Sequence, residues 1–180
     1  MPSSRVAVVG AGVSALVHEL IEHGYGHVDA IDLSQAALDT LRTCLGDRSG
    51  NVNFVRADVR EVCLDGQVDV WHDRATFHFL IDADSRRAYA ERLCETVRVG
   101  GHAIVATFSE NGPEQCSGLP VARYSAESLH AQFAACFDLV ESWTLDHLTP
   151  WGAPQSFTHA LLRRVERGVG GPSGADRVSR

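Results

Sequence analysis

Short apolar runs alternate with segments of helical periodicity along most of the chain. Residues 6–9 form an apolar run that ends at Gly10, which is typical of a strand buried on both faces. Apolar side chains at positions 16, 17, 20 and 21 then repeat at the spacing of a helix. Further strands are expected at residues 28–31, 52–55, 68–71 and 104–108, with helices at 34–45, between 82 and 100, and near 125–133. This alternation predicts a parallel sheet covered by helices on both faces.

The last part of the chain breaks this alternation. Residues 137–145 and 157–162 have the pattern of two strands with no helix between them. Parallel neighbours need a connection of about a dozen residues or more, so these two strands must pair antiparallel or lie apart. The expected fold is α/β, with a Rossmann-like doubly wound sheet of about seven strands, mostly parallel with an antiparallel last strand. We expect one domain over residues 1–165 and a disordered tail, rich in Gly, Ser and Arg, over residues 166–180.

Composition narrows the possible functions of this domain. The 180 residues carry a net charge of −7 and include no lysine, which argues against a nucleic-acid partner and excludes both a P-loop lysine and a Schiff-base lysine. No apolar run is long enough to span a membrane, and the chain enters a strand by Arg5 without the pattern of a signal peptide. We therefore expect a cytoplasmic protein with no membrane partner.

The five cysteines do not have the spacing of a metal site. They stand at positions 44, 63, 94, 116 and 136, with no Cys-x-x-Cys pair and no histidine at zinc-finger spacing, so no metal is expected. We expect reduced and mostly buried thiols, with only Cys116 accessible because it lies in a polar stretch.

A glycine turn follows the first predicted strand. Its residues are Gly10, Ala11, Gly12, Val13 and Ser14, in a place where the backbone must turn sharply and let a ligand approach closely. Asp32 ends the second strand about 20 residues later, where a carboxylate can accept hydrogen bonds from both ribose hydroxyls. Leu33 follows it. The combination indicates a nucleotide-type ligand, and it is also compatible with NAD.

A second acidic residue is expected on the same edge of the sheet. Asp58 ends the third strand, and Val59 follows it. Because the carboxyl ends of parallel strands meet at one edge, Asp58 is expected to lie near the base of a bound nucleoside. Asp58 would then accept a hydrogen bond from an exocyclic amine.

These motifs together resemble the class I S-adenosylmethionine-dependent methyltransferases over residues 6–164. The glycine turn is similar to their first motif, residues 31–34 to their acidic ribose-binding motif, and Asp58 with Val59 to their adenine-binding turn. Residues 99–102 are similar to the usual entry into their fifth strand. One departure is Val8, where most members of the family carry an acidic residue. The resemblance implies S-adenosylmethionine as cofactor and methyl transfer as the reaction.

The end of the fourth strand is the position where this superfamily keeps residues that face donor and acceptor. Here it reads Trp71, His72, Asp73 and Arg74, and an Arg-x-x-Tyr element follows at residues 86–89. This pair of elements resembles the thiopurine-type thiol methyltransferases. We expect His72 at the cofactor, and we assign Asp73, Arg74 and His78 as catalytic candidates, with Arg74 as an anion clamp and His78 or Asp73 as the base. The alternative is that Asp73 and Arg74 pair structurally while Phe77, Phe79 and Leu80 pack into the core.

Two long segments are candidates for closing the site. Residues 109–123 and 147–156 are predicted to lie at the carboxyl edge, and long loops in a compact domain commonly serve a function. The expected substrate is a small molecule, with a thiol or another soft nucleophile favoured; the oligomeric state stays open. The alternatives are a protein lysine methyltransferase, which the glycine turn also resembles, an NAD-dependent oxidoreductase, and a scaffold that has lost activity.

Overall fold

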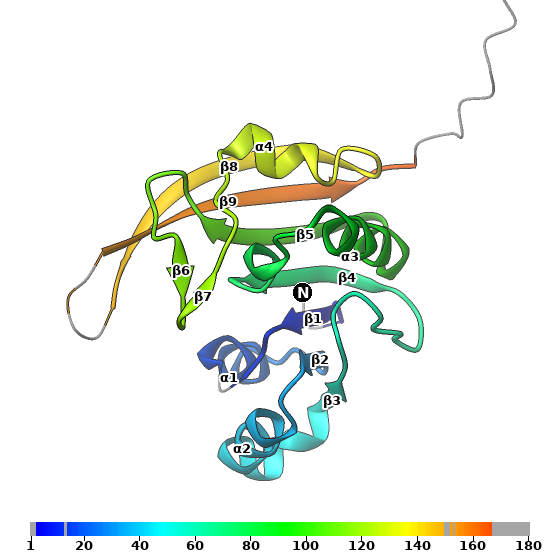
Figure 1. Cartoon of the computed structure of the whole chain (residues 1–180). Coiled ribbons are helices and arrows are strands. Elements are labelled where there is room, and N and C mark those ends of the chain that lie inside the picture. The colour runs from blue at the N-terminus through cyan, green and yellow to red at the C-terminus, as the bar shows by residue number, and fades with distance from the viewer. Residues whose placement is uncertain (1–2, 13, 150–151, 153, 167–180) are drawn as a thin grey trace, which may run out of the picture.

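The computed structural model of the chain describes residues 3–12, 14–149, 152 and 154–166. A seven-stranded sheet in the order β3-β2-β1-β4-β5-β9-β8 forms the centre of the molecule (Figure 1). All neighbouring strands pair parallel except β9, which runs antiparallel to both β5 and β8. The strands are β1 (Arg5–Val9), β2 (His27–Asp32), β3 (Val52–Arg56), β4 (Val68–Arg74), β5 (Val97–Phe108), β8 (Phe137–Leu148) and β9 (Pro154–Arg164). The predicted Rossmann-like sheet with one antiparallel strand is confirmed.

Helices cover both faces of this sheet. The elements outside the sheet are α1 (Ala15–Glu22), α2 (Gln35–Leu45), α3 (Ala83–Thr96) and α4 (Ala126–Ala131), the short 3-10 helices η1 (Gly46–Asn51) and η2 (Phe77–Phe79), and a hairpin of β6 (Gln115–Cys116) and β7 (Leu119–Pro120). The helices start where the sequence offers a cap. Ser34 accepts a hydrogen bond from the backbone N–H of Ala37 at 3.2 Å, and Asp82 accepts one from Ser85 at 2.8 Å.

Alternate residues of the central strands point to opposite faces of the sheet and pack in two separate hydrophobic cores. Val6 and Val8 of β1 pack in the core that includes Val17 of α1 and Leu38 of α2. The residues between and after them, Ala7 and Val9, pack on the opposite face of the sheet, with α3 and α4. A strand buried on both faces must be apolar at every position, which is why β1 reads as a continuous hydrophobic run. Each fully buried valine or leucine stabilises the fold by about 1.5–3 kcal/mol.

The fifth strand begins earlier than the sequence pattern predicts. Strand pairing was expected from Ile104, but β5 starts at Val97, directly after α3, and passes through both Gly100 and Gly101. The pairing with β4 shifts register between Val68 and Val70, opposite this glycine pair. A Cβ on Gly101 would lie 2.8 Å from the carbonyl oxygen of Asp69, so the close approach of β4 and β5 requires glycine there.

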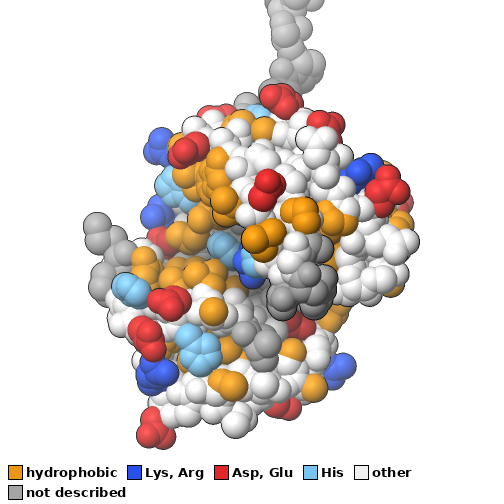
Figure 2. Space-filling model, turned by 90° about the vertical axis from the view of Figure 1, so that its left-hand side faces the viewer, with side chains coloured by type: hydrophobic (Ala, Val, Ile, Leu, Met, Phe, Trp, Pro, Cys, Tyr) orange, Lys and Arg blue, Asp and Glu red, His pale blue; other side chains and the backbone are white. Residues whose placement is uncertain are grey.

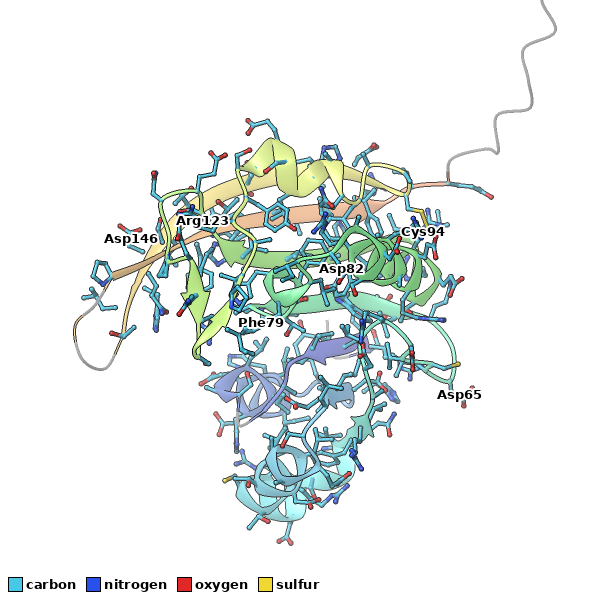
Figure 3. The ribbon with its side chains drawn as sticks, in the orientation of Figure 1. Asp65, Phe79, Asp82, Cys94, Arg123 and Asp146 are labelled. Carbon is cyan, nitrogen blue, oxygen red and sulfur yellow. A yellow bond between two sulfur atoms is a disulfide. The ribbon has the colours of Figure 1, made fainter. Side chains whose placement is uncertain are left out.

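The expectation for the cysteines is wrong. Cys94 and Cys136 form a disulfide that joins the end of α3 to the turn before β8, with Cα atoms 5.9 Å apart (Figure 3, where Cys94 is labelled). Cys44 and Cys63 are exposed, whereas Cys116 is only partly so. The two bridged residues are 42 positions apart, and only the packing of α3 beside the α4–β8 connection brings them together.

Two predictions for the chain reach beyond the described residues. The expected tail over residues 166–180 falls there except for Glu166, and the candidate lid over residues 147–156 is described only in part. Among the described residues, no helix is long and apolar enough to cross a membrane.

Candidate functional site

The glycine turn after β1 has a backbone that only glycine adopts without strain. Gly10 has a φ of +59° and Gly12 a φ of +46°. The N–H of Gly12 donates a hydrogen bond to Oδ2 of Asp32 at 2.8 Å, and that of Ala11 donates to the carbonyl of Ile31 at 3.0 Å. These bonds hold the turn against the end of β2.

Space is tight above the first glycine. A Cβ on Gly10 would collide with the Oγ1 atom of Thr76, which follows β4. Ser14, at the other end of the turn, caps α1: its Oγ accepts a hydrogen bond from the N–H of Leu16 at 3.2 Å. The turn therefore brings β1, β4 and the start of α1 together at the carboxyl edge of the sheet.

Asp32 lies at the end of β2, and its carboxylate can still accept hydrogen bonds from a ligand. Its Oδ1 accepts the N–H of Ser34 at 2.8 Å and its Oδ2 accepts that of Gly12, so each carboxylate oxygen retains a second lone pair. A cavity of about 270 Å³ opens beside it, with Leu33 and Val59 among its apolar residues. A carboxylate, a glycine with positive φ and apolar side chains around one cavity suit a ribose with its attached base.

Asp58, the expected adenine contact, already accepts hydrogen bonds from a neighbouring arginine. Asp58 lies two residues after β3, and its Oδ1 accepts hydrogen bonds from both the backbone N–H and the Nε of Arg60, each at 2.9 Å. The Nη2 of Arg60 donates to Oδ2. These bonds hold the pKa of Asp58 below its usual value. Val59 is buried and lines the cavity next to Asp32.

Asp73 is fully buried in the core rather than open to the cavity. It accepts hydrogen bonds from the hydroxyl of Tyr89 at 2.6 Å and from the backbone N–H groups of Thr76 and Phe77 at 2.8 and 3.0 Å. Burial raises its pKa to about 6, although these hydrogen bonds oppose the shift. The carboxylate thus holds the turn after β4, in which Ala75 has a strained φ of +69°.

His78 is also enclosed. Its ring is fully buried and lies 4.6 Å from that of Phe79 and 4.8 Å from that of Phe108, measured between centroids. Neither ring nitrogen has a hydrogen-bond partner among the described residues. Desolvation lowers the pKa of His78 to about 4, so the imidazole is neutral at pH 7.

His72 and Arg74 are the members of this segment that reach open space. Both line a second cavity, of about 330 Å³, together with Gly10, Ser14 and the first turn of α1. Arg74 and Gly10 also line the cavity beside Asp32, so the two spaces adjoin at these residues. Burial, then the charge of Arg74, lowers the pKa of His72 to about 4.

Two further residues, to which no sequence pattern pointed, extend this face. His159 on β9 pairs with Ala106, which also pairs with Arg74 of β4, and its pKa is lowered first by burial and also by the charge of Arg74. The ring of Trp143 on β8 stacks on that of His159, with centroids 5.1 Å apart and planes at 11°. No motif marks either residue; a known register between β5, β9 and β8 would have revealed them.

The predicted site residues therefore fall into two groups. The first group lies around the two cavities or in the glycine turn and consists of Gly10, Ala11, Gly12, Ser14, Asp32, Leu33, Val59, His72 and Arg74. Asp58 lies beside that cavity in an ion pair, while Asp73 and His78 lie inside the protein. Among the described residues, no group of three or more His, Cys, Asp or Glu side chains is arranged to hold a metal ion.

Comparison with known proteins agrees with this geometry. Residues 6–101 match the family model described as a methyltransferase domain. The human eEF1A lysine and N-terminal methyltransferase is 21% identical over 116 residues, which is 61% of this chain but only 17% of that protein.

Solved structures share the fold over nearly the whole chain. The 1,6-didemethyltoxoflavin-N1-methyltransferase of Burkholderia thailandensis, crystallised with its substrate and S-adenosylhomocysteine, has a TM-score of 0.72 at 22% identity, covering 91% of this chain and 72% of that one. A structure described as converting a disulfide bond into a thioacetal group during echinomycin biosynthesis has a TM-score of 0.76 at 22% identity, covering 91% and 76%. The chain therefore belongs to the methyltransferase domain family and shares the fold of these solved structures.

Proposed function

We propose that this protein transfers the methyl group of S-adenosylmethionine to a small molecule that binds between α1 and the end of β4. The observation that carries the proposal is the pair of adjoining cavities, one beside Asp32 and one beside His72, that meet at Gly10 and Arg74. A donor and an acceptor held in adjoining spaces can be aligned for an in-line displacement, in which positioning supplies much of the rate.

The residues present suit the donor. Asp32 would hold the ribose hydroxyls, Leu33 and Val59 the adenine faces, and the glycine turn would allow close backbone approach. When bound, the cofactor supplies an electrophilic methyl group on a sulfonium. The adjacent wall of His72 and Arg74 would orient the acceptor.

The protein groups that line the two cavities favour an acceptor that needs no strong base. Their titratable side chains are Asp32, His72 and Arg74. Arginine stays protonated, Asp32 is engaged by two backbone N–H groups, and His72 has a pKa of about 4. A histidine with so low a pKa is a weak base at pH 7, whereas proton abstraction from an amine or alcohol favours a base with a pKa near 7. A thiol, which ionises easily, or another soft nucleophile fits this site best.

We assign Asp73 and His78 to positioning and packing. Asp73 fixes the turn that carries Thr76 over the glycine turn, and His78 fills space between Phe79 and Phe108. Arg74 then remains as the side chain that contacts the acceptor. A cytoplasmic location is part of this proposal.

Binding of S-adenosylhomocysteine to the Asp32→Ala variant tests the donor site. The loss of charge-assisted hydrogen bonds, each worth about 1.5–3 kcal/mol, should weaken the calorimetric affinity by about ten-fold or more. Asp47→Ala removes an exposed aspartate of η1 and should leave the affinity unchanged. Because Asp32 also holds Gly12 and Ser34, Asp32→Asn provides a milder variant. Unchanged affinity in folded Asp32 variants, or tight binding of NAD at this site, would refute the proposal.

A second candidate function is methylation of a protein amine. The similarity to the human eEF1A lysine and N-terminal methyltransferase favours it, although the match spans 17% of that protein. Turnover with a panel of thiols, amines and lysine peptides separates the two candidates. Transfer to lysine peptides without transfer to any small thiol would select the second.

A further inference from the structure

A row of side chains crosses four strands on one face of the sheet. Arg74 on β4 pairs in register with Ala106 on β5, Ala106 with His159 on β9, and His159 with Trp143 on β8. Directly paired residues in neighbouring strands point to the same face, so the four lie side by side. His72, two residues before Arg74, points to the same face.

The polar members of this row have unused binding capacity. Arg74 makes no hydrogen bond or ion pair with the part of the chain that the structure describes. The Nδ1 atoms of both His72 and His159 are buried and also lack partners there. A buried polar atom without a partner is costly, which is tolerated where a ligand or water completes the site.

The only charged side chain in this row of described residues is the guanidinium of Arg74, so the row is positively charged. Arg74 is exposed and carries a positive charge, which lowers the pKa values of both His72 and His159. No acidic group contributes to the shift of either histidine. Figure 2, which faces the carboxyl edge of the sheet, shows histidine and arginine side chains together in a hollow bordered by hydrophobic ones.

The row also extends away from the donor cavity. It starts at Arg74, which lines both cavities, and reaches β9, which is two strands beyond β4 and on the side opposite β1 and β2. Trp143 at its far end is 38% exposed, so this end is open to solvent. The donor lies at β1 and β2, and His159 is therefore placed for the other substrate.

We propose that Arg74, His72 and His159 form a subsite for a carboxylate of the methyl acceptor, which makes the acceptor an anionic small molecule. The inference rests on the proposed function above. Arginine binds a carboxylate through two parallel N–H groups, and each neutral imidazole supplies a further N–H donor. Trp143 is a positioning residue, because its stacked ring fixes the orientation of His159.

Two probes of nearly the same shape, one anionic and one neutral, test this subsite. Benzoate and benzamide are titrated into protein saturated with S-adenosylhomocysteine, and the imidazole nitrogen signals of His72 and His159 are followed by NMR. We expect benzoate to bind about ten-fold more tightly than benzamide and to shift both signals. Arg74→Gln should abolish the preference and Arg74→Lys should retain part of it, since lysine cannot bind in the bidentate way. Arg48→Gln, at an exposed ion pair with Glu22, is the matched control.

The role of Trp143 has its own readout. Trp143→Leu should reduce the preference for benzoate and broaden the His159 signal without changing affinity for S-adenosylhomocysteine, and Trp143→Phe should restore both. A role in stability alone would lower the unfolding midpoint and leave the preference intact, which contradicts the assignment.

The competing occupant of Arg74 is the carboxylate of the cofactor's own amino acid. Methylthioadenosine, which lacks that group, distinguishes the two sources. If Arg74→Gln weakens S-adenosylhomocysteine but not methylthioadenosine, the arginine serves the donor and the inference is overturned. Equal binding of benzoate and benzamide to the wild type overturns it too, while intact cofactor binding in the same sample leaves the proposed function standing. Failure of the wild type to bind S-adenosylhomocysteine would instead defeat the proposed function.

Discussion

The hydroxyl of Tyr89 donates a hydrogen bond to the carboxylate of Asp73 across 2.6 Å inside the core, and it accepts one from the indole of Trp71 at 3.0 Å. Through Asp73 the chain of bonds reaches the backbone of Thr76 and Phe77. Helix α3, which carries Tyr89, is thereby tied to the turn that borders the glycine loop.

Removing this hydroxyl should destabilise the protein. Tyr89→Phe leaves the Trp71 N–H without an acceptor and Asp73 without one donor, each a buried polar group that costs about 1–3 kcal/mol when unpaired. Urea unfolding at pH 7.5 should show a lower free energy of unfolding with an unchanged m-value. Tyr124→Phe, in the same aromatic cluster but with no side-chain hydrogen bond among the described residues, should change stability by less than about 0.5 kcal/mol. Equal effects of the two variants would contradict this role of Tyr89.

Gly10 should tolerate no side chain. Gly10→Ala combines a positive φ with a collision against Thr76, so we expect the affinity for S-adenosylhomocysteine to fall by about ten-fold or more. Gly24→Ala has a similar backbone strain, with a φ of +81°, but nothing within 4 Å of the added Cβ. It should lower stability by about 1 kcal/mol and leave affinity intact. Calorimetry on both variants makes the comparison, and a similar loss of affinity in Gly24→Ala would show that the effect is not local.

His78 should make stability depend on pH. Burial lowers its pKa from 6.5 to about 4, so between these values the unfolded chain binds a proton that the folded protein does not. The free energy of unfolding is therefore unaffected by this group above pH 6.5. It falls by about 3 kcal/mol in total as the pH is lowered toward 4. Asp73, whose pKa rises from 3.8 to about 6, acts in the opposite sense, being most stabilising at low pH.

The difference in stability between the wild type and a His78 variant, measured against pH, separates the contribution of His78 from that of Asp73. His78→Leu should be at least as stable as the wild type at pH 7.5, and the gap in its favour should widen as pH falls from 6.5 to 5. His27→Leu, at an exposed position at the start of β2, should show no such trend. Parallel pH curves for wild type and His78→Leu would show that the ring is not buried as described.

The disulfide should be a major contribution to stability. Joining residues 42 positions apart removes chain entropy from the unfolded state that is worth about 4 kcal/mol. The double variant Cys94→Ala/Cys136→Ala should lose stability of this order and become insensitive to dithiothreitol. Cys63→Ala, at an exposed free thiol, should match the wild type. If dithiothreitol leaves the wild-type unfolding curve unmoved, the bridge does not form in solution.

The sequence predicted the parts of this protein that depend on local pattern. Apolar periodicity located the seven strands, and the glycine turn with Asp32 pointed to the edge of the sheet where we propose the donor site, because both signals are short-range. The burial of Asp73 could not be read in this way, since it depends on where β4 stops and on Tyr89 from a helix 16 residues later. His159 and Trp143 escaped prediction for a similar reason: register across β5, β9 and β8 is a long-range property.

The antiparallel strand has a consequence for how the chain reaches its fold. Strand β9 is synthesised after β8 but lies between β5 and β8, so β8 has no place in the sheet until β9 has been added to the edge of β5. During synthesis the twelve residues of β8 therefore have no strand to pair with until β9 is made, and the backbone groups at the edge of β5 also remain unpaired. Unpaired edges are the sites at which chains associate wrongly. Aggregation of nascent or refolding protein should depend on how quickly residues 154–164 pair with β5 and β8.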